Sequence, residues 1–134
     1  DFNVNLHARI AALGPTVRYG DLCSPETLLH AGVDKAKVVV CTIPDDVLKG
    51  TTNRRIVEAV RQINPGAIII ANAIELGDTE HLYAAGADYV FLQRIETARA
   101  VEAAIAKALA GDIKTYRETM VAAYGVPGPR DEVM

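Results

Sequence analysis

The sequence predicts an α/β fold with a layered parallel sheet, and three observations carry this prediction. Four short apolar runs are rich in β-branched or aromatic residues, which favours strands, and they lie at 16–19, 37–43, 67–71 and 88–92. The segments between these runs have apolar residues at the three- to four-residue spacing of amphipathic helices. Glycine and proline lie at the boundaries between the two kinds of segment. Because strand and helix alternate, neighbouring strands are expected to be parallel and joined by right-handed crossovers.

In the first half of the chain, a helix with apolar residues at positions 6, 10 and 13 is expected before the strand at 16–19. Ser24 and Pro25 form a helix start, with serine as the N-cap and proline at the first helical position. Gly14, Gly32 and Gly86 each follow a helical stretch, where a residue with positive φ ends a helix. The runs at 37–43 and 67–71 do not alternate with polar residues, which favours strands covered on both faces.

In the second half, a helix with apolar positions 56, 60 and 63 is expected to stop at the turn Asn64–Gly66. The strand at 67–71 follows, and the strand at 88–92 precedes a helix with apolar positions 98, 101, 105 and 109. After Gly111 an apolar stripe marks one more helix that no strand follows: Ile113, Tyr116, Met120, Ala123 and Tyr124. This stripe either packs on its own domain or docks on a partner, and residues 126–134 are expected to be a frayed end or linker.

Composition excludes several function classes. The chain has 134 residues, 50% hydrophobic and 23% charged, with a formal net charge of -3, so no basic field is present to hold a nucleic acid. No apolar run approaches the roughly 20 residues that a membrane span needs. The two cysteines, Cys23 and Cys41, have different settings, which argues against a disulfide and favours a reducing cytosol. The sequence opens at Asp1 without a methionine, and we expect it to be a fragment of a longer protein.

Candidate binding residues lie at the carboxyl ends of the expected strands. No Gly-x-Gly turn and no P-loop occurs in the chain, yet Asp1 lies where the second strand of a nucleotide-binding fold delivers the carboxylate that holds a ribose diol. Asp21 follows Gly20 at a second such end, and Thr42 lies at the third, where its hydroxyl could meet a phosphate or a sugar. The carboxylates have structural alternatives. Asp1 could be an N-cap or a solvated terminal residue, and Asp21 could form a turn or an Asx-type cap of the helix that follows Ser24. Asp45 and Asp46, which follow Thr42, could be partners of the next helix dipole.

The sequence offers no candidate residues for catalysis or for metal binding. The three histidines are far apart in sequence, so no metal site is expected. Neither cysteine has a neighbouring histidine or lysine that would activate a thiol. Arg54, Arg55 and Arg61 follow Asn53 on the expected helix, and they either line the cleft or form a solvated face. We therefore expect a binding domain rather than an enzyme.

Seven motifs follow one another along the chain. They are Asp1-Phe-Asn3, Tyr19-Gly-Asp21, Ser24-Pro-Glu-Thr-Leu28, Ala31-Gly-Val-Asp34, Val38-Val-Val-Cys-Thr-Ile-Pro-Asp-Asp46, Thr52-Asn53 and Ala84-Ala-Gly-Ala-Asp-Tyr-Val90. In this order the chain resembles the TrkA-N domain, also called the RCK (regulator of K⁺ conductance) domain. The resemblance is strongest to the version attached to bacterial cation:proton antiporters and potassium efflux systems. It covers about residues 1–110, which sets the expected domains at 1–110, 111–125 (the last helix) and 126–134 (the tail).

The resemblance implies a Rossmann-type sheet of order 3-2-1-4-5-6 that lacks its first βα unit and most of its second strand, followed by the extra C-terminal helix. It also implies an adenine nucleotide such as NAD(H), AMP or ATP, with weak or no binding by this fragment alone. By position, Asp1 would hold the ribose, Gly20 and Asp21 would lie along the adenine, and Thr42 would approach the ribose or phosphate. Asn53 matches a polar position at the start of the next helix.

Two residues depart from the family pattern. Asn72 stands where many relatives carry an arginine that can meet a phosphate, and an amide does not supply that charge. Gln93 stands where a proline is commoner, at the entry to the next helix. The missing strands also leave a gap between the strand at 16–19 and the strand at 37–43. We expect these two strands to pair directly, or a second copy to fill the gap.

The function that this resemblance implies is a cytosolic, dimeric, ligand-sensing domain of a monovalent cation transporter, located at the inner face of the plasma membrane. Nucleotide binding would shift the attached or associated transporter, a potassium or sodium/proton antiporter, between states. Two alternatives stay open: a fragment of an NAD-dependent oxidoreductase, and a structural dimerisation module whose nucleotide site has decayed.

Overall fold

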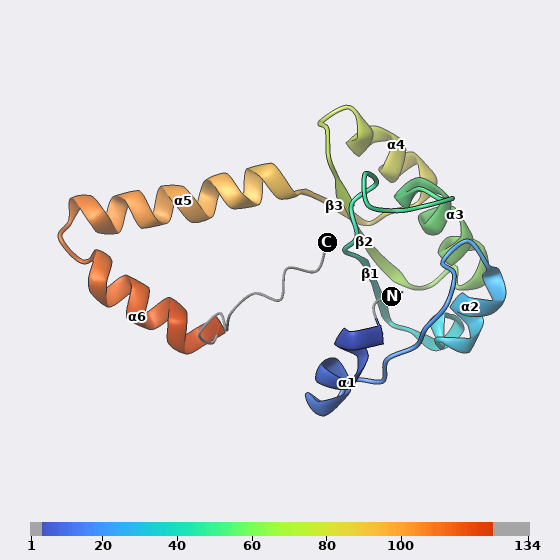
Figure 1. Ribbon diagram of the computed structural model, residues 1–134. Helices are drawn as coiled ribbons and strands as arrows, with labels where there is room; N and C mark the ends of the chain where they lie inside the picture. Colours follow the sequence, from blue (N-terminus) through green and yellow to red (C-terminus); the bar gives the residue numbers. More distant parts are fainter. Residues whose placement is uncertain (1–3, 125–134) are drawn as a thin grey trace. The chain divides into compact units, whose positions relative to one another are not determined.

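The computed structural model describes residues 4–124, and the chain divides into two compact units, Asp1–Gln93 and Arg94–Met134. The elements of the first unit are, in chain order, α1 (Val4–Ala12), α2 (Pro25–His30), the short 3-10 helix η1 (Val33–Lys35), β1 (Val38–Cys41), α3 (Asn53–Ile63), β2 (Ile68–Ala73), α4 (Asp78–Ala85) and β3 (Tyr89–Leu92), as Figure 1 shows.

The sheet is parallel, with strand order β1-β2-β3. Val40 of β1 lies opposite Ile70 of β2, and Ile70 in turn lies opposite Tyr89 of β3. The helices α3 and α4 supply the crossovers between these strands, as the alternation of patterns predicts. The predicted fold class, a Rossmann-type parallel sheet with flanking helices, is confirmed.

The core lies between one face of the sheet and the helices α2, α3 and α4. From the sheet, Ile69, Ala71 and Val90 are buried, and from α3 the buried side chains include Val57 and Val60. Figure 1 shows the three helices on this one side of the strands. The predicted apolar spacing of α3 is therefore the spacing that fills the core.

The opposite face of the same sheet stays open within this unit. Val40 is 50% exposed, and Val38, Ile68 and Tyr89 are exposed to a similar degree. Successive side chains of a strand point to opposite faces, so the unbroken run of β1 presents alternate valines to each face. The expectation that β1 and β2 are covered on both faces is wrong for this unit, because α2, α3 and α4 cover one face while side chains of the other face stay about half exposed.

The run Thr16–Tyr19 was expected to be a strand, and this prediction is wrong: no strand is assigned there, and Tyr19 is exposed. A strand needs a neighbour for its backbone N–H and C=O groups, and the strand beside which the resemblance places this run is not among β1–β3. The expected direct pairing of this run with β1 is wrong for the same reason. In the described part of the single chain, β1 and β3 are the two edges of the sheet.

The predicted punctuation is confirmed. Gly14, Gly32 and Gly86 have φ values of 105°, 82° and 113°, which end α1, α2 and α4 in the left-handed region. Ser24 is the N-cap of α2 with Pro25 in its first turn, although the serine side chain makes no capping hydrogen bond.

Arg61, in the last turn of α3, makes hydrogen bonds to the turn between α3 and β2 and to the turn between α4 and β3. Its guanidinium donates to the carbonyl oxygens of Pro65 (2.8 Å), Ala67 (2.7 Å) and Gly86 (2.6 Å), and to the carboxylate of Asp88 (2.9 Å). The Asp88 carboxylate also accepts from the backbone N–H of Ile69, and this bond holds the pKa of Asp88 below its usual value. Arg61 thus has a structural role, with its side chain 27% exposed rather than fully solvated.

The second unit contains most of α5 (Gln93–Leu109) and the helix α6 (Ile113–Tyr124), so the expected last helix is present. Neither helix has a buried residue: Val101 and Ile105 are about half exposed, and Tyr124 is 84% exposed. The predicted tail at 126–134 lies outside the described residues, and the domain boundary at residue 110 stays a prediction. No helix among residues 4–124 is long and apolar enough to cross a bilayer.

Candidate functional site

The carboxyl ends of β1, β2 and β3 meet at one edge of the sheet, because the strands are parallel. In open parallel α/β sheets, this edge is the usual place for a ligand. Thr42 is the first residue after β1 and is exposed, while its carbonyl oxygen accepts from the Gln93 side chain at 3.5 Å. The predicted site residue Thr42 therefore lies at the predicted edge, with its side chain accessible.

The loop that contains Gly20 and Asp21 lies between α1 and α2. The exposed Asp21 accepts a hydrogen bond from the Cys23 backbone N–H at 2.8 Å, which lowers the pKa of the Asp21 carboxyl and makes the Asx turn expected as its structural alternative. A Cβ built on Gly20 would collide with the side chain of Thr27 on α2. Gly20 thus allows the loop to approach α2 closely, and the group that lies against it in this structure is the Thr27 side chain.

Cys23 connects this loop to the segment between β1 and α3. Its thiol is 3.9 Å from the carbonyl oxygen of Lys49, at the distance of a weak sulfur hydrogen bond. The hydrogen bond and negative charge of Asp21 raise the pKa of the Cys23 thiol. The structure therefore places the loop 20–23 beside the connector that follows Thr42.

Asn53, the first residue of α3, is buried and makes hydrogen bonds to the loop that follows β1. Its side chain is 1% exposed, and its Nδ2 donates to the carbonyl oxygen of Ile43 and to the carboxylate of Asp45, both at 2.8 Å. Asp45 also accepts from the Asn53 backbone N–H at 2.7 Å, so this carboxylate caps α3. Thr52 adds a second cap by accepting from the Arg55 backbone N–H. The side-chain NH2 group of Asn53 thus bonds to the loop after β1. Contact between Asn53 and a nucleotide stays a prediction.

Asn72, in β2, converges on the same loop. It is 1% exposed, and its Nδ2 donates to the carbonyl oxygens of Cys41 (2.8 Å) and Ile43 (3.1 Å). The Oδ1 atoms of Asn53 and Asn72 are buried and accept no hydrogen bond. An unpaired buried acceptor costs about 1–3 kcal/mol, so these two oxygens are unusual. The sequence marked Asn72 only as the replacement for an arginine, and gave no sign of its bonds to the loop.

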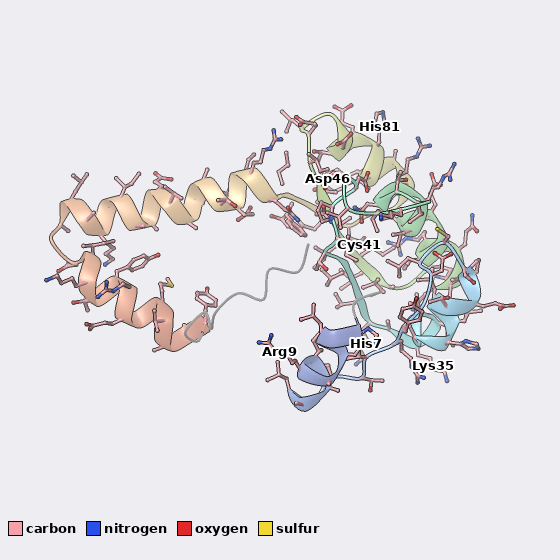
Figure 2. All side chains as sticks on the ribbon, in the orientation of Figure 1. His7, Arg9, Lys35, Cys41, Asp46 and His81 are labelled. Carbon is pink, nitrogen blue, oxygen red and sulfur yellow. The ribbon has the colours of Figure 1, made fainter. Side chains whose placement is uncertain are left out.

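A cavity of about 500 Å³ opens between the first turns of α3 and α4, beside the end of β2. Its lining residues are Asp45, Thr52, Arg54, Arg55, Glu58, Asn72, Ala73, Asp78, His81 and Leu82. Sequence reasoning grouped Arg54 and Arg55 near a cleft as one of two alternatives, and missed the contribution of α4. Figure 2 shows His81 extending from α4 and Cys41 on the sheet.

Of the predicted site residues, Thr42 lies directly after β1 and Asn53 is bonded to the Ile43 carbonyl oxygen, whereas the loop with Gly20 and Asp21 lies beside Lys49, farther along the connector. Their joint contact with a nucleotide stays a prediction. Asp1 lies outside the described residues. Cys41 is buried, which raises its pKa to about 11, so this thiol has the character of a core side chain. Among residues 4–124 no cluster of three or more metal-ligating side chains occurs.

Comparison with known proteins identifies the family to which the first unit is similar. The profile of the TrkA-N domain matches residues 1–93. No curated protein matches the sequence.

Several solved structures are similar in fold, among them the following three. The TrkA-N domain of the inner membrane protein YbaL from Escherichia coli has a TM-score of 0.62 and 24% identity, over 74% of this chain and 70% of that one. The NAD(P)-binding domain of an exopolyphosphatase-related protein from Archaeoglobus fulgidus has a TM-score of 0.65 and 20% identity, over 80% and 77% of the two chains. The GsuK channel bound to NAD has a TM-score of 0.56 and 24% identity, over 67% of this chain and 16% of that one. The present chain thus spans less than a quarter of GsuK.

Proposed function

The chain belongs to the TrkA-N family, and from this membership we propose that it is a regulatory domain that binds an adenine nucleotide and controls a monovalent cation transporter. The observation that carries the proposal is the family match over residues 1–93, which covers the whole sheet and its polar carboxyl edge. The proposed domain acts by binding, without a catalytic group of its own, in the cytosol at the inner face of the membrane.

The neighbours in fold support this proposal in part. GsuK has been seen bound to NAD and to ADP, and YbaL is an inner membrane protein. A nucleotide in the present chain would contact the exposed Thr42 after β1 and the exposed Asp21 in the loop beside the following connector. Because the pKa of Asp21 is lowered, its carboxylate is ionised at neutral pH and can accept hydrogen bonds from a ribose or an adenine amine.

Control of the transporter would operate through a dimer. We propose that nucleotide binding favours one dimer geometry over another, and that an attached or associated membrane domain responds to the change. The exposed apolar residues of α5 and α6 support the presence of a partner surface outside the first unit.

One observation favours a second candidate, a dimerisation module without a nucleotide. Asn72 stands at the position of an expected phosphate-binding arginine, and its amide is occupied by the carbonyls of Cys41 and Ile43. This position therefore offers no positive charge to a phosphate. The two candidates differ in whether any adenine nucleotide binds.

Calorimetric titration distinguishes them. AMP, ATP, NAD and NADH are titrated into the 134-residue chain and into a version lengthened at its N-terminus, in which the family's glycine-rich loop is expected. The proposal is supported if a nucleotide gives saturable heat and if Asp21→Asn lowers its affinity by about tenfold, as for the loss of one hydrogen bond to a charged group. The exposed Asp34 supplies the matched control Asp34→Asn. No heat from any nucleotide in either version contradicts nucleotide sensing and leaves the dimerisation module.

A further inference from the structure

The turn that carries Thr42 is held by hydrogen bonds on both of its sides. Thr42 itself is exposed, yet the carbonyl oxygens of its two neighbours, Cys41 and Ile43, both accept from the side-chain NH2 group of Asn72, at 2.8 Å and 3.1 Å. The Ile43 oxygen also accepts from the NH2 group of Asn53 at 2.8 Å. Because the backbone is fixed one residue before and one residue after Thr42, the positions of the Thr42 Cα and Cβ atoms are fixed as well.

The two asparagines come from different elements and meet at one atom. Asn53 is the first residue of α3, Asn72 lies in β2, and each is 1% exposed. A carbonyl oxygen has two lone pairs, so the Ile43 oxygen can accept from both amides at once. Asp45 completes the arrangement, since its carboxylate accepts from the backbone N–H and from the NH2 group of Asn53. The loop after β1 is therefore joined to both α3 and β2.

Stability alone does not account for these two side chains. The Oδ1 atoms of Asn53 and Asn72 are buried and accept no hydrogen bond from the described residues. An unpaired buried acceptor offsets about the gain from one or two hydrogen bonds, and each NH2 group makes two. Turning either amide over would not relieve this cost, because Oδ1 would then face the Ile43 carbonyl oxygen. The asparagines thus contribute mainly a fixed geometry of the turn.

We propose that Asn53 and Asn72 are positioning residues, which together hold the backbone around Thr42 so that the threonine hydroxyl is presented to the nucleotide; this rests on the function proposed above. Both act through the Ile43 carbonyl group, because their own side chains are buried. Loss of the Asn72 NH2 group frees the backbone on both sides of Thr42. The apparent Kd of a ligand rises in proportion as the conformation that binds it becomes rarer.

Nitrogen-15 relaxation of the 134-residue chain tests the positioning without any ligand. We expect an order parameter of about 0.85 for the Thr42 backbone N–H, the value of a rigid backbone, and a fall below about 0.6 in Asn72→Ala. The NMR signals of the Asn53 NH2 group should shift in the same variant, because the two amides share one acceptor. Ile69→Ala is the control, since it removes a fully buried side chain of β2 and no donor to the turn.

Asp45→Ala repeats the test at an exposed residue, so the outcome does not depend on whether Asn72→Ala folds. This variant removes the carboxylate that accepts from Asn53, and it should also lower the order parameter of Thr42. Asp46→Ala, at the exposed neighbouring position, should leave it unchanged. The proposal is overturned if Thr42 is already mobile in the unaltered chain, if it stays rigid in folded Asn72→Ala or in Asp45→Ala, or if Ile69→Ala mobilises it equally.

Calorimetric titration of the N-terminally lengthened chain with AMP, ATP, NAD and NADH then connects the order of the turn to binding. Asn72→Ala should raise the Kd of the nucleotide that binds by about tenfold, as for a turn that is in place about one-tenth of the time, and Ile69→Ala should leave it unchanged. An unchanged Kd in Asn72→Ala with a mobile Thr42 would overturn the positioning role. Absence of binding by every nucleotide contradicts the proposed function instead, while the relaxation data still decide whether the asparagines order the turn.

Discussion

Replacement of Arg61 by alanine tests how the carboxyl-terminal end of α3 is held. The substitution removes the donors to the carbonyl oxygens of Pro65, Ala67 and Gly86. At about 1 kcal/mol net for each of these three carbonyl acceptors, the free energy of unfolding should fall by about 3 kcal/mol. The partly exposed ion pair with Asp88 adds little to this value. The loss is a large share of the roughly 5–15 kcal/mol that stabilises a typical domain.

The same helix supplies the control. Arg54 is exposed and makes one ion pair with Glu58, so Arg54→Ala should cost about 0.5 kcal/mol or less. Urea unfolding followed by circular dichroism measures both variants, with the slope against denaturant expected to stay unchanged. The reasoning is refuted if the free energies of unfolding of the two variants differ by less than about 1 kcal/mol. Water would then replace the Arg61 guanidinium as the donor to these carbonyl oxygens at little cost.

Three further predictions follow from burial and charge. Ile69→Ala, at a side chain with no exposed area, should destabilise the chain by about 2–5 kcal/mol, whereas Ile68→Ala on the open face should cost less than about 1 kcal/mol in the same urea assay. The folded-state pKa of Asp88 is below 3.8, so the stabilisation that its ionised form provides is complete above that value and is lost as the pH falls further; Asp88→Asn should flatten the stability profile in this acid range. With a thiol reagent at pH 8, the exposed Cys23 should react in the native state, although more slowly than a free cysteine because the hydrogen bond with Asp21 raises its pKa, while Cys41, whose pKa burial raises to about 11, should react only on unfolding.

Local patterns predicted the elements that depend on local forces. The apolar runs at 37–43, 67–71 and 88–92 became β1, β2 and β3, and the spacing of Ile56 and Val60 placed the buried face of α3. The run at 16–19 has the same local character and is not a strand. Strand formation depends on a neighbouring strand, and a sequence pattern carries no information on whether that neighbour is present.

The candidate site was predictable to a similar extent. The structural alternatives were an Asx turn for Asp21 and a partner at the N-terminus of the next helix for Asp45. Both are confirmed, with hydrogen-bond partners two and eight residues away. The bonds of Asn72 join positions about thirty residues apart, across the sheet. Only the register of β1 on β2 brings those positions together, so the sequence pattern did not reveal the hydrogen bonds of Asn72 or the cavity beside them.

The most direct test of the central claim is the calorimetric titration of NAD, NADH, AMP and ATP into the N-terminally lengthened chain, compared with its Asp21→Asn and Asp34→Asn variants. The account predicts saturable binding of at least one adenine nucleotide that weakens by about tenfold in Asp21→Asn and stays unchanged in Asp34→Asn. Absence of binding by every nucleotide, or equal binding by the two variants, would contradict the proposal that the carboxyl edge of this sheet senses a nucleotide.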